Sequence, residues 1–227
     1  MTAQRAMDVI ANNLANVSTN GFKRDGIAFN DALERELEQG GRNVGSLGSG
    51  ASVQSIFTDF SIGSMTETGN PLDLALESPK GLFAIQTPSG VRYTRDGSFG
   101  LDVNRQLITK DGMPVLDDQN RPITVESGSI SVQSDGTIQI DGEPKAKIGI
   151  FDAAGFVKEG LNRFTPAGPV TTSTATVKSG ALESSNVNAV DAMVQMIQLS
   201  RLFEMSQKSI TSQDELTQRL IQSLSER

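Results

Sequence analysis

The last 39 residues of the chain decide how its fold is organised. From Ala189 to Arg227 they read AVDAMVQMIQLSRLFEMSQKSITSQDELTQRLIQSLSER, with neither glycine nor proline. A stretch of this length without a helix breaker predicts one continuous helix, about 58 Å long at ~1.5 Å per residue. Asn188 stands where an N-cap is expected, and Asp191 places a carboxylate at the positive end of the helix dipole.

Apolar residues recur along this helix in two groups. The first is a seam with heptad spacing, made of Met196, Phe203, Ile210 and, at an offset of three, Leu199 and Leu220. The second broadens the N-terminal half of the helix: Val190, Met193, Val194 and Ile197. Apolar faces that the chain itself does not cover need partners. We therefore expect this helix to pack against other helices, including those of further copies of the chain.

A matching stripe opens the chain. Its apolar residues follow the spacing of a helix seam: Ala3, Met7, Ile10, Leu14 and Val17. We expect this helix to end near Ser18–Thr19, because Asn20-Gly21 is a strong turn signal and Gly21 adopts a left-handed backbone readily. Beside the stripe lie three amides that we expect to bond across subunits, since a buried amide requires a partner: Asn12, Asn13 and Asn16.

The middle of the chain changes to a period of two, which is typical of strands. Two hairpins are predicted, one joining residues 82–86 to 91–95 and one joining 130–133 to 137–140. Further strands are expected at residues 107–109 and 147–151. Short strands separated by Gly and Asp turns indicate an antiparallel sandwich or an irregular barrel.

These patterns together predict an α+β fold. Paired N- and C-terminal helices, coiled-coil-like, form a discontinuous helical domain around an inserted, mainly antiparallel β domain. The expected segments are an N-terminal helical segment (1–30), a Gly/Ser-rich connector (31–60) that opens with a weak helix at 31–39, the β domain (61–180) and the C-terminal helix (181–227).

Composition excludes several functional classes. The chain has no Cys and no His, so disulfides, zinc fingers, His-ligated metals and triads with a His base are excluded. A net charge of −7 argues against nucleic acid as a partner. No apolar run approaches the ~18–20 residues that span a bilayer, and no cleavable signal is visible. We expect no enzyme activity, no cofactor, no metal, no small-molecule substrate and no membrane insertion.

Three alternatives stay open at this point. The terminal helices would form an ordinary helical hairpin packed on the β domain. Alternatively, the β domain would be a ligand-binding or adhesion module that such a hairpin dimerises. A glycan-cleaving enzyme would need two carboxylates ~5–9.5 Å apart, and the sequence nominates no pair. The isolated Asp-Gly pairs, such as Asp135-Gly136, are typical of turns rather than calcium loops.

Three segments of the sequence resemble bacterial flagellar rod and hook proteins. The first is residues 8–23, DVIANNLANVSTNGFK, and it is long and specific. The central block comprises residues 68–75, 81–83 and 93–99, and the C-terminal block comprises residues 179–188 with Met193, Met196-Ile197, Arg201, Phe203-Glu204 and Lys208. The size and the single β insertion resemble a basal-body rod protein of the proximal or distal rod more than the larger hook subunit.

The resemblance implies an inner tube of paired terminal helices with an outer β domain. It implies export through the flagellar type III channel without a cleaved signal, and helical assembly in the periplasm into the hollow axial shaft that transmits torque and passes exported subunits. The partners are then copies of the chain and other rod or hook subunits. Family members usually carry several more helical turns before the equivalent of Met1, and this sequence begins part-way into that segment.

On this basis we expect an assembly interface built from both ends of the chain. Gly21 is expected to terminate the first helix. The expected interface residues are Met7, Ile10, Asn12, Asn13, Leu14, Asn16, Val17, Val190, Met193, Met196, Ile197, Phe203, Ile210 and Leu220.

Overall fold

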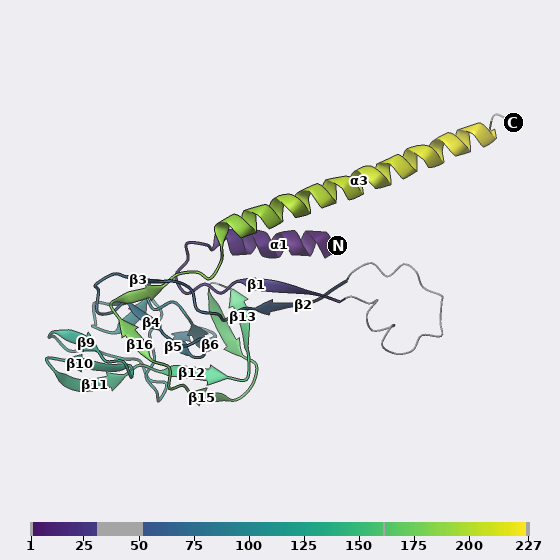
Figure 1. Ribbon diagram of the computed structural model, residues 1–227. Helices are drawn as coiled ribbons and strands as arrows, with labels where there is room; N and C mark the ends of the chain where they lie inside the picture. Colours follow the sequence, from purple (N-terminus) through teal and green to yellow (C-terminus); the bar gives the residue numbers. More distant parts are fainter. Residues whose placement is uncertain (1, 31–51, 161, 226–227) are drawn as a thin grey trace, which may run out of the picture. The chain divides into compact units, whose positions relative to one another are not determined.

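The computed structural model describes residues 2–30, 52–160 and 162–225. Within these residues two helices and seventeen strands form an α+β fold, as the sequence predicts (Figure 1). The chain divides into two units: the helical unit (Met1–Ala15, Asp25–Phe57 and Asn188–Arg227) and the β unit (Asn16–Arg24 and Thr58–Val187). The expected weak helix at 31–39 and the glycine-rich stretch at 40–50 lie outside the described residues.

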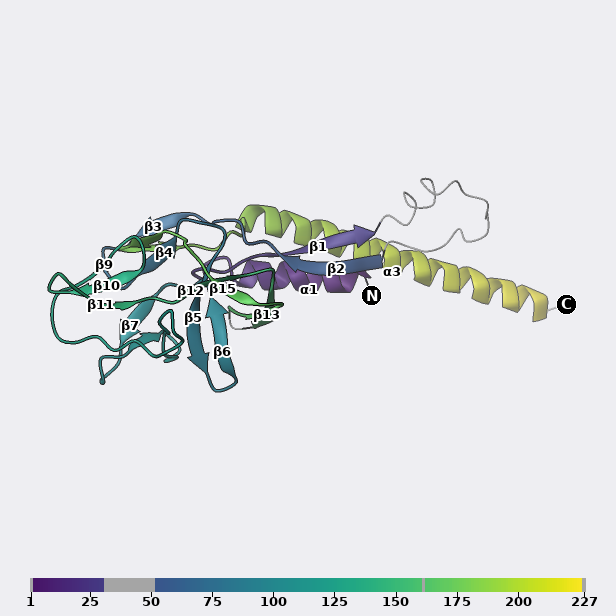
Figure 2. The same ribbon diagram turned by 90° about the horizontal axis from the view of Figure 1, so that it is seen from below.

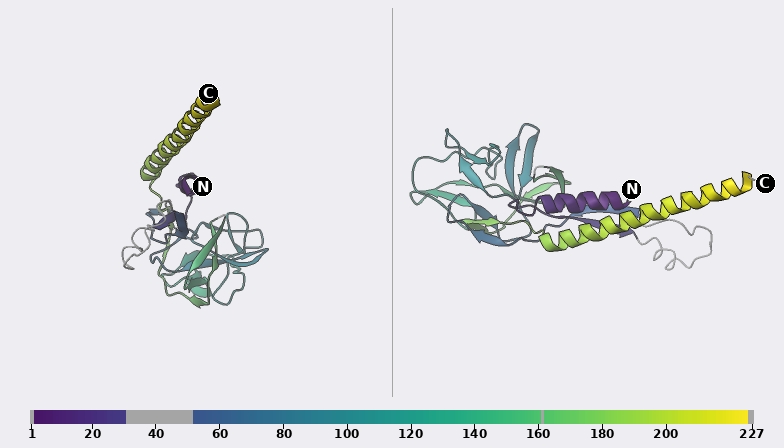
Figure 3. Two further views of the ribbon diagram at one scale, coloured as in Figure 1. Left: turned by 90° about the vertical axis from the view of Figure 1, so that its right-hand side faces the viewer. Right: turned by 90° about the horizontal axis from the view of Figure 1, so that it is seen from above.

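Two helices define the helical unit, α1 (Thr2–Ala15) and α3 (Ala189–Ser225). They lie side by side in opposite directions, with α1 along the first part of α3 (Figure 3). The buried face of α1 contains Ala6 and Ile10, whereas Met7 and Leu14 are only half-buried. The buried face, which also includes Val9 and Asn13, is therefore turned from the predicted stripe.

The termini of the two helices follow local chemistry. The side-chain oxygen of Asn188 accepts hydrogen bonds from the backbone N–H groups of Val190 (3.0 Å) and Asp191 (3.3 Å), which confirms the predicted N-cap. The end of α1 was predicted too late: the helix stops at Ala15, and a turn begins in which Thr19 N–H donates to Asn16 O at 3.2 Å.

Strands β1 (Asp25–Asn30) and β2 (Ser52–Thr58) pair with each other and belong mainly to the helical unit. The sequence analysis placed these residues in a helical segment and in a connector, so the structure differs there. The Phe57 ring lies over Gly26, where an added Cβ would be 2.5 Å from its Cζ atom. This contact between residues 31 positions apart leaves no periodic pattern in the sequence.

The β unit is built around a six-stranded antiparallel sheet, in which Figure 2 shows the β5–β6 hairpin clearly. In spatial order its strands are β13 (Phe156–Gly160), β14 (Arg163–Pro166), β6 (Gly90–Thr94), β5 (Leu82–Thr87), β12 (Ile150–Ala153) and β15 (Val170–Thr172). The predicted hairpin at 82–95 is thereby confirmed. The strand predicted at 147–151 is wrong in its bounds, because β11 ends at Lys147 and β12 begins at Ile150.

Smaller sheets complete the β unit. One has three strands, β11 (Glu143–Lys147), β10 (Thr137–Ile140) and β9 (Ile130–Val132), and confirms the predicted hairpin at 130–140. Three strand pairs follow: β16 (Val177–Ser179) with β4 (Leu74–Leu76), β17 (Ala181–Glu183) with β3 (Met65–Glu67), and β7 (Phe99–Leu101) with β8 (Leu107–Thr109). Two of these pairs join the start of the unit to its last residues.

The main apolar core of the β unit lies between these sheets. Its largest fully buried side chains include Phe83, Leu76, Ile138 and Ile148. The rings of Phe83 and Phe99 meet edge to face, with centroids 5.2 Å apart. Ile138 lies opposite Val132 across the β9–β10 pair and is buried in this core, with Val132 packed against it.

Truncating Phe83 to alanine should lower the free energy of unfolding of the β unit by about 3–5 kcal/mol, because the side chain is wholly buried and a cavity replaces it. Urea denaturation followed by circular dichroism measures the change. The control is Val103→Ala, at a side chain that is 97% exposed, with an expected change within about 0.5 kcal/mol. A loss below about 1 kcal/mol for Phe83→Ala would contradict the assigned core.

Candidate functional site: a buried ion-pair network

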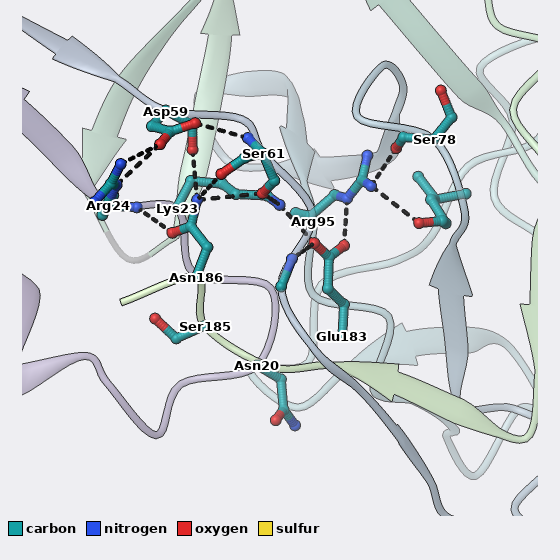
Figure 4. A network of polar contacts seen from close by, with 12 residues as sticks. Asn20, Lys23, Arg24, Asp59, Ser61, Ser78, Arg95, Glu183, Ser185 and Asn186 are labelled. Carbon is teal, nitrogen blue, oxygen red and sulfur yellow. Dashed lines mark hydrogen bonds and ion pairs between the residues drawn. The ribbon is translucent and has the colours of Figure 1, made fainter. Parts of the chain in front are cut away.

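Three segments that are far apart in the sequence meet inside the β unit (Figure 4). They are residues 21–24, 59–64 and 183–186. Backbone hydrogen bonds join them: Gly21 N–H donates to Glu183 O at 2.7 Å, Asp59 N–H donates to Arg24 O at 2.9 Å, and Ser184 N–H donates to Ser64 O at 2.8 Å. The segment that follows α1 is thus tied to the segment that precedes α3.

Glu183 lies at the centre of this junction. One carboxylate oxygen accepts hydrogen bonds from Lys23 Nζ at 2.5 Å and from Gly63 N–H at 2.9 Å. The other oxygen accepts a hydrogen bond from Arg95 Nε at 2.6 Å. Lys23, Arg95 and Glu183 are 0%, 1% and 2% exposed, so two buried cations share one carboxylate, which offsets only part of their combined charge.

Backbone carbonyls satisfy further donors of the two cations. Lys23 Nζ also donates to Ser61 O at 2.7 Å. Arg95 donates through Nη1 to Gly81 O at 2.6 Å and through Nη2 to Leu76 O at 3.1 Å and to Ser78 O. Each buried cation therefore bonds the Glu183 carboxylate and at least one backbone carbonyl, as a buried ionic site requires.

Burial and charge oppose each other at Lys23. Removal from water lowers the pKa of Lys23 below its usual 10.5, and the hydrogen bond to Glu183 and its negative charge oppose that decrease. Removing one partner of a buried ion pair costs about 3–5 kcal/mol, because an uncompensated charge remains in the interior. A domain is stable by only about 5–15 kcal/mol. Loss of Glu183 would therefore remove much of the stability of the β unit.

A second layer of polar contacts surrounds the buried network. The side-chain nitrogen of Asn186 donates to Asp59 O at 2.8 Å, and its side-chain oxygen accepts from Arg24 N–H at 2.8 Å. The Asp59 carboxylate accepts hydrogen bonds from Arg24 Nε and from Ser61 N–H, each at 2.9 Å. Burial would raise the pKa of Asp59, but the hydrogen bonds from Ser61 and Arg24 outweigh this effect and hold the pKa below 3.8.

Gly21 fits tightly against the network. Its φ of +64° lies in the left-handed region, and an added Cβ would be 2.4 Å from the Arg95 carbonyl carbon and oxygen. The predicted role of Gly21 as the terminator of the first helix is wrong, because α1 ends at Ala15. The left-handed backbone was predicted correctly, but it serves the close approach of residues 21–24 to Arg95.

The predicted interface residues of the C-terminal helix are mostly exposed. Val190, Met193, Ile197 and Phe203 are 67%, 50%, 54% and 38% exposed, and Met196 is half-buried. The side chains of Ile210 and Leu220 lie outside the described residues. The exposed residues Val190, Val194 and Ile197 share a helix face, and Ala192 and Met196 lie on another.

The predicted interface residues near the N-terminus are more buried than those of α3. Ile10 and Asn13 are buried, Met7, Leu14, Asn16 and Val17 are half-buried, and Asn12 is exposed. The Asn13 amide exchanges two hydrogen bonds with the Asp25 backbone, at 2.8 and 2.9 Å, and the Asn16 oxygen accepts from Thr19 Oγ1 at 3.2 Å. These two amides thus have partners within the chain, which the expectation of bonds across subunits did not anticipate.

The sequence analysis did not single out Lys23, Arg95 or Glu183 as a site. Each is a charged residue inside one of the three segments that carry the resemblance. No periodicity or spacing marks the three residues, because Arg95 and Lys23 lie 88 and 160 positions from Glu183 along the chain.

Other features of the described residues point away from ligand chemistry. A surface hollow of about 290 Å³ is lined by Glu77, Ser78, Lys80, Asp152 and residues 171–176, and it lacks the apolar walls of a typical small-molecule site. No cluster of three or more acidic side chains able to hold a metal ion occurs in the part that the structure describes. The two described helices also lack the apolar length that would cross a membrane.

Substituting Gly21 by alanine should destabilise the β unit by at least about 2 kcal/mol, because the new Cβ would collide with the Arg95 backbone in a left-handed conformation. Thermal or urea unfolding measures this loss. The matched control is Gly112→Ala, which has φ of +77° but nothing within 4 Å of an added Cβ. Equal losses for both variants would show that strain alone, without the close approach, accounts for the effect.

Substituting Asp59 by asparagine should cost about 1 kcal/mol at neutral pH, because a charge-assisted hydrogen bond is lost. The pKa of Asp59 is depressed in the folded chain, so its contribution is fully present above pH 3.8 and is lost as the pH falls through the folded pKa. Urea unfolding at several pH values should show the difference between the two proteins shrinking in acid. A difference that grows below pH 3.8 would contradict the assigned contacts.

Comparison with known protein families gives three matches along the chain. The family described as "Flagella basal body rod protein" matches residues 1–23, "Flagellar hook protein FlgE/F/G D1 domain" matches residues 78–140, and "Flagellar basal body rod FlgEFG protein C-terminal" matches residues 178–223. Lys23, Arg95 and Glu183 each fall in a different one of these segments. The buried network therefore joins all three matched regions.

Individual relatives agree with these matches. The flagellar basal-body rod protein FlgG of Bacillus subtilis is 36% identical over 246 residues, which cover 96% of this chain and 93% of the relative. FlgG of Buchnera aphidicola subsp. Schizaphis graminum is also 36% identical, over 95% and 93%. FlgF of Caulobacter vibrioides is 31% identical over 99% of this chain and 94% of the relative. The chain belongs to the family of flagellar basal-body rod proteins, which are structural proteins and not enzymes.

Proposed function

We propose that this chain is a structural subunit of the flagellar basal-body rod that assembles with copies of itself and with other rod or hook subunits. The helical unit forms the inner tube and the β unit lies outside it. The assembled hollow shaft lies in the periplasm, transmits torque and passes exported subunits. The subunit itself arrives by flagellar export. Family membership and the absence of His- or Cys-based chemistry support this proposal.

The observation that carries the proposal is the exposed apolar face of α3. Val190, Val194 and Ile197 are 67%, 47% and 54% exposed, and residues at these spacings lie on one side of a helix. A cluster of large apolar side chains left in water is unfavourable and marks an interaction surface. Burial by the helices of neighbouring subunits, in coiled-coil-like pairs, would remove this exposure.

Helix α1 contributes to the same interface through its half-buried residues. Met7 and Leu14 are partly covered in the single chain, so neighbouring subunits are expected to bury the rest of their surface. On α3, Met196 belongs to the seam beside α1, and Phe203 extends this seam one heptad further. Both ends of the chain thus supply the tube, whereas the β unit sets the spacing between subunits.

The substitution Ile197→Asp should abolish assembly, because a carboxylate cannot be buried without a partner in a helix interface. The monomer should keep its free energy of unfolding within about 0.5 kcal/mol, because Ile197 is exposed. Electron microscopy of basal bodies from complemented deletion cells measures assembly, and swimming in soft agar measures function.

The matched control is Gln195→Asp, which introduces the same charge two residues away on a different, exposed face of α3. This variant should assemble and support swimming. Complete rods in cells that carry Ile197→Asp would contradict the assigned face, and loss of rods with Gln195→Asp would show that any added charge is sufficient.

A further inference from the structure

The buried network joins residues that emerge at very different times when the chain is synthesised from its N-terminus. Lys23 and Glu183 are 160 positions apart, and Arg95 and Glu183 are 88 positions apart. When a chain emerges with its N-terminus first, both cations are present long before their shared carboxylate. Until Glu183 follows, the two cations cannot enter the interior with their charge compensated.

The strands closest to Glu183 add to this dependence. Strand β16 pairs with β4, whose three residues are all buried, and β17 pairs with β3. The backbone N–H of Glu77 donates to Thr176 O at 2.9 Å, and Val177 contributes a buried side chain to the main core. Without residues 176–183, β4 would lack a neighbour on the β16 side, and buried backbone groups without partners are strongly unfavourable.

We propose that Glu183 acts as a folding gate for the β unit: the unit stays open until the segment around Glu183 arrives and its carboxylate forms ion pairs with both Lys23 and Arg95. The gate does not depend on the proposed self-assembly, because every residue of the gate lies in the β unit.

The gate makes a prediction about the order of folding in the full-length chain. Refolding from urea with pulsed hydrogen exchange reports when each backbone N–H becomes protected. Two amides report the centre of the unit: Ala84 N–H donates to Gly149 O, and Leu116 N–H donates to Ala84 O. The amides of Gly21 and Ser184 report the junction. The gate requires all four amides to become protected in one phase. Protection of Ala84 and Leu116 at least tenfold faster than that of Gly21 and Ser184 would overturn it.

Variants of the full chain test the role of the charge. Glu183→Gln should slow refolding of the β unit at least tenfold or leave it open, because a neutral amide cannot compensate two cations. The matched control is Glu67→Gln, which removes an ion pair to Lys178 (2.9 Å) whose two side chains are 78% and 37% exposed. This control should refold within about twofold of the unmodified chain. An unchanged rate for Glu183→Gln, or an equal effect of Glu67→Gln, would overturn the gate.

A double variant keeps the test decisive if Glu183→Gln does not fold at all. Adding Lys23→Met removes one of the two buried cations while keeping an unbranched side chain of similar length. Lys23→Met/Glu183→Gln should therefore recover at least tenfold in refolding rate or in folded fraction relative to Glu183→Gln alone. The double variant loses one buried cation and the carboxylate, so its buried groups have the same net charge as in the unmodified chain. No recovery would therefore overturn the gate.

Discussion

A single buried carboxylate holds together the β unit of this protein. Glu183 forms ion pairs with both Lys23 and Arg95 in a region where all three side chains are at most 2% exposed. Charges in such a place are tolerated only when they are paired and hydrogen-bonded, so the backbone must bring three distant segments to fixed positions. The close approach of Gly21 to the Arg95 backbone and the strand pairs β16–β4 and β17–β3 follow from the same convergence.

The two units differ in how completely they bury their apolar side chains. The β unit buries its own apolar core and pairs the buried charges of Lys23, Arg95 and Glu183 within one chain. The helical unit leaves large apolar side chains of α3 such as Val190 and Ile197 in water, although α1 packs beside it. A self-sufficient unit joined to an incomplete one is the arrangement expected of a subunit whose helices are completed by its neighbours.

The distribution of amides shows why interface residues are difficult to assign from a pattern. Asn13 lies on the predicted helix, yet its side chain bonds the Asp25 backbone at the start of β1. Asn16 accepts from Thr19 in the turn that ends α1. An amide next to a seam can serve the same chain or a neighbouring one, and only the position of the following segment decides between them.

Elements that depend on nearby residues could be predicted from the amino-acid pattern. The α3 helix and its Asn188 cap, the hairpins at 82–95 and 130–140, and the inward face of Ile138 follow from periodicity, caps and turn residues within a few positions. Only the tertiary structure decided the β1–β2 pair, the orientation of α1 and the meeting of Lys23, Arg95 and Glu183. Such contacts join residues from 31 to 160 positions apart, and an ion pair over that separation leaves no period or spacing that a single sequence reveals.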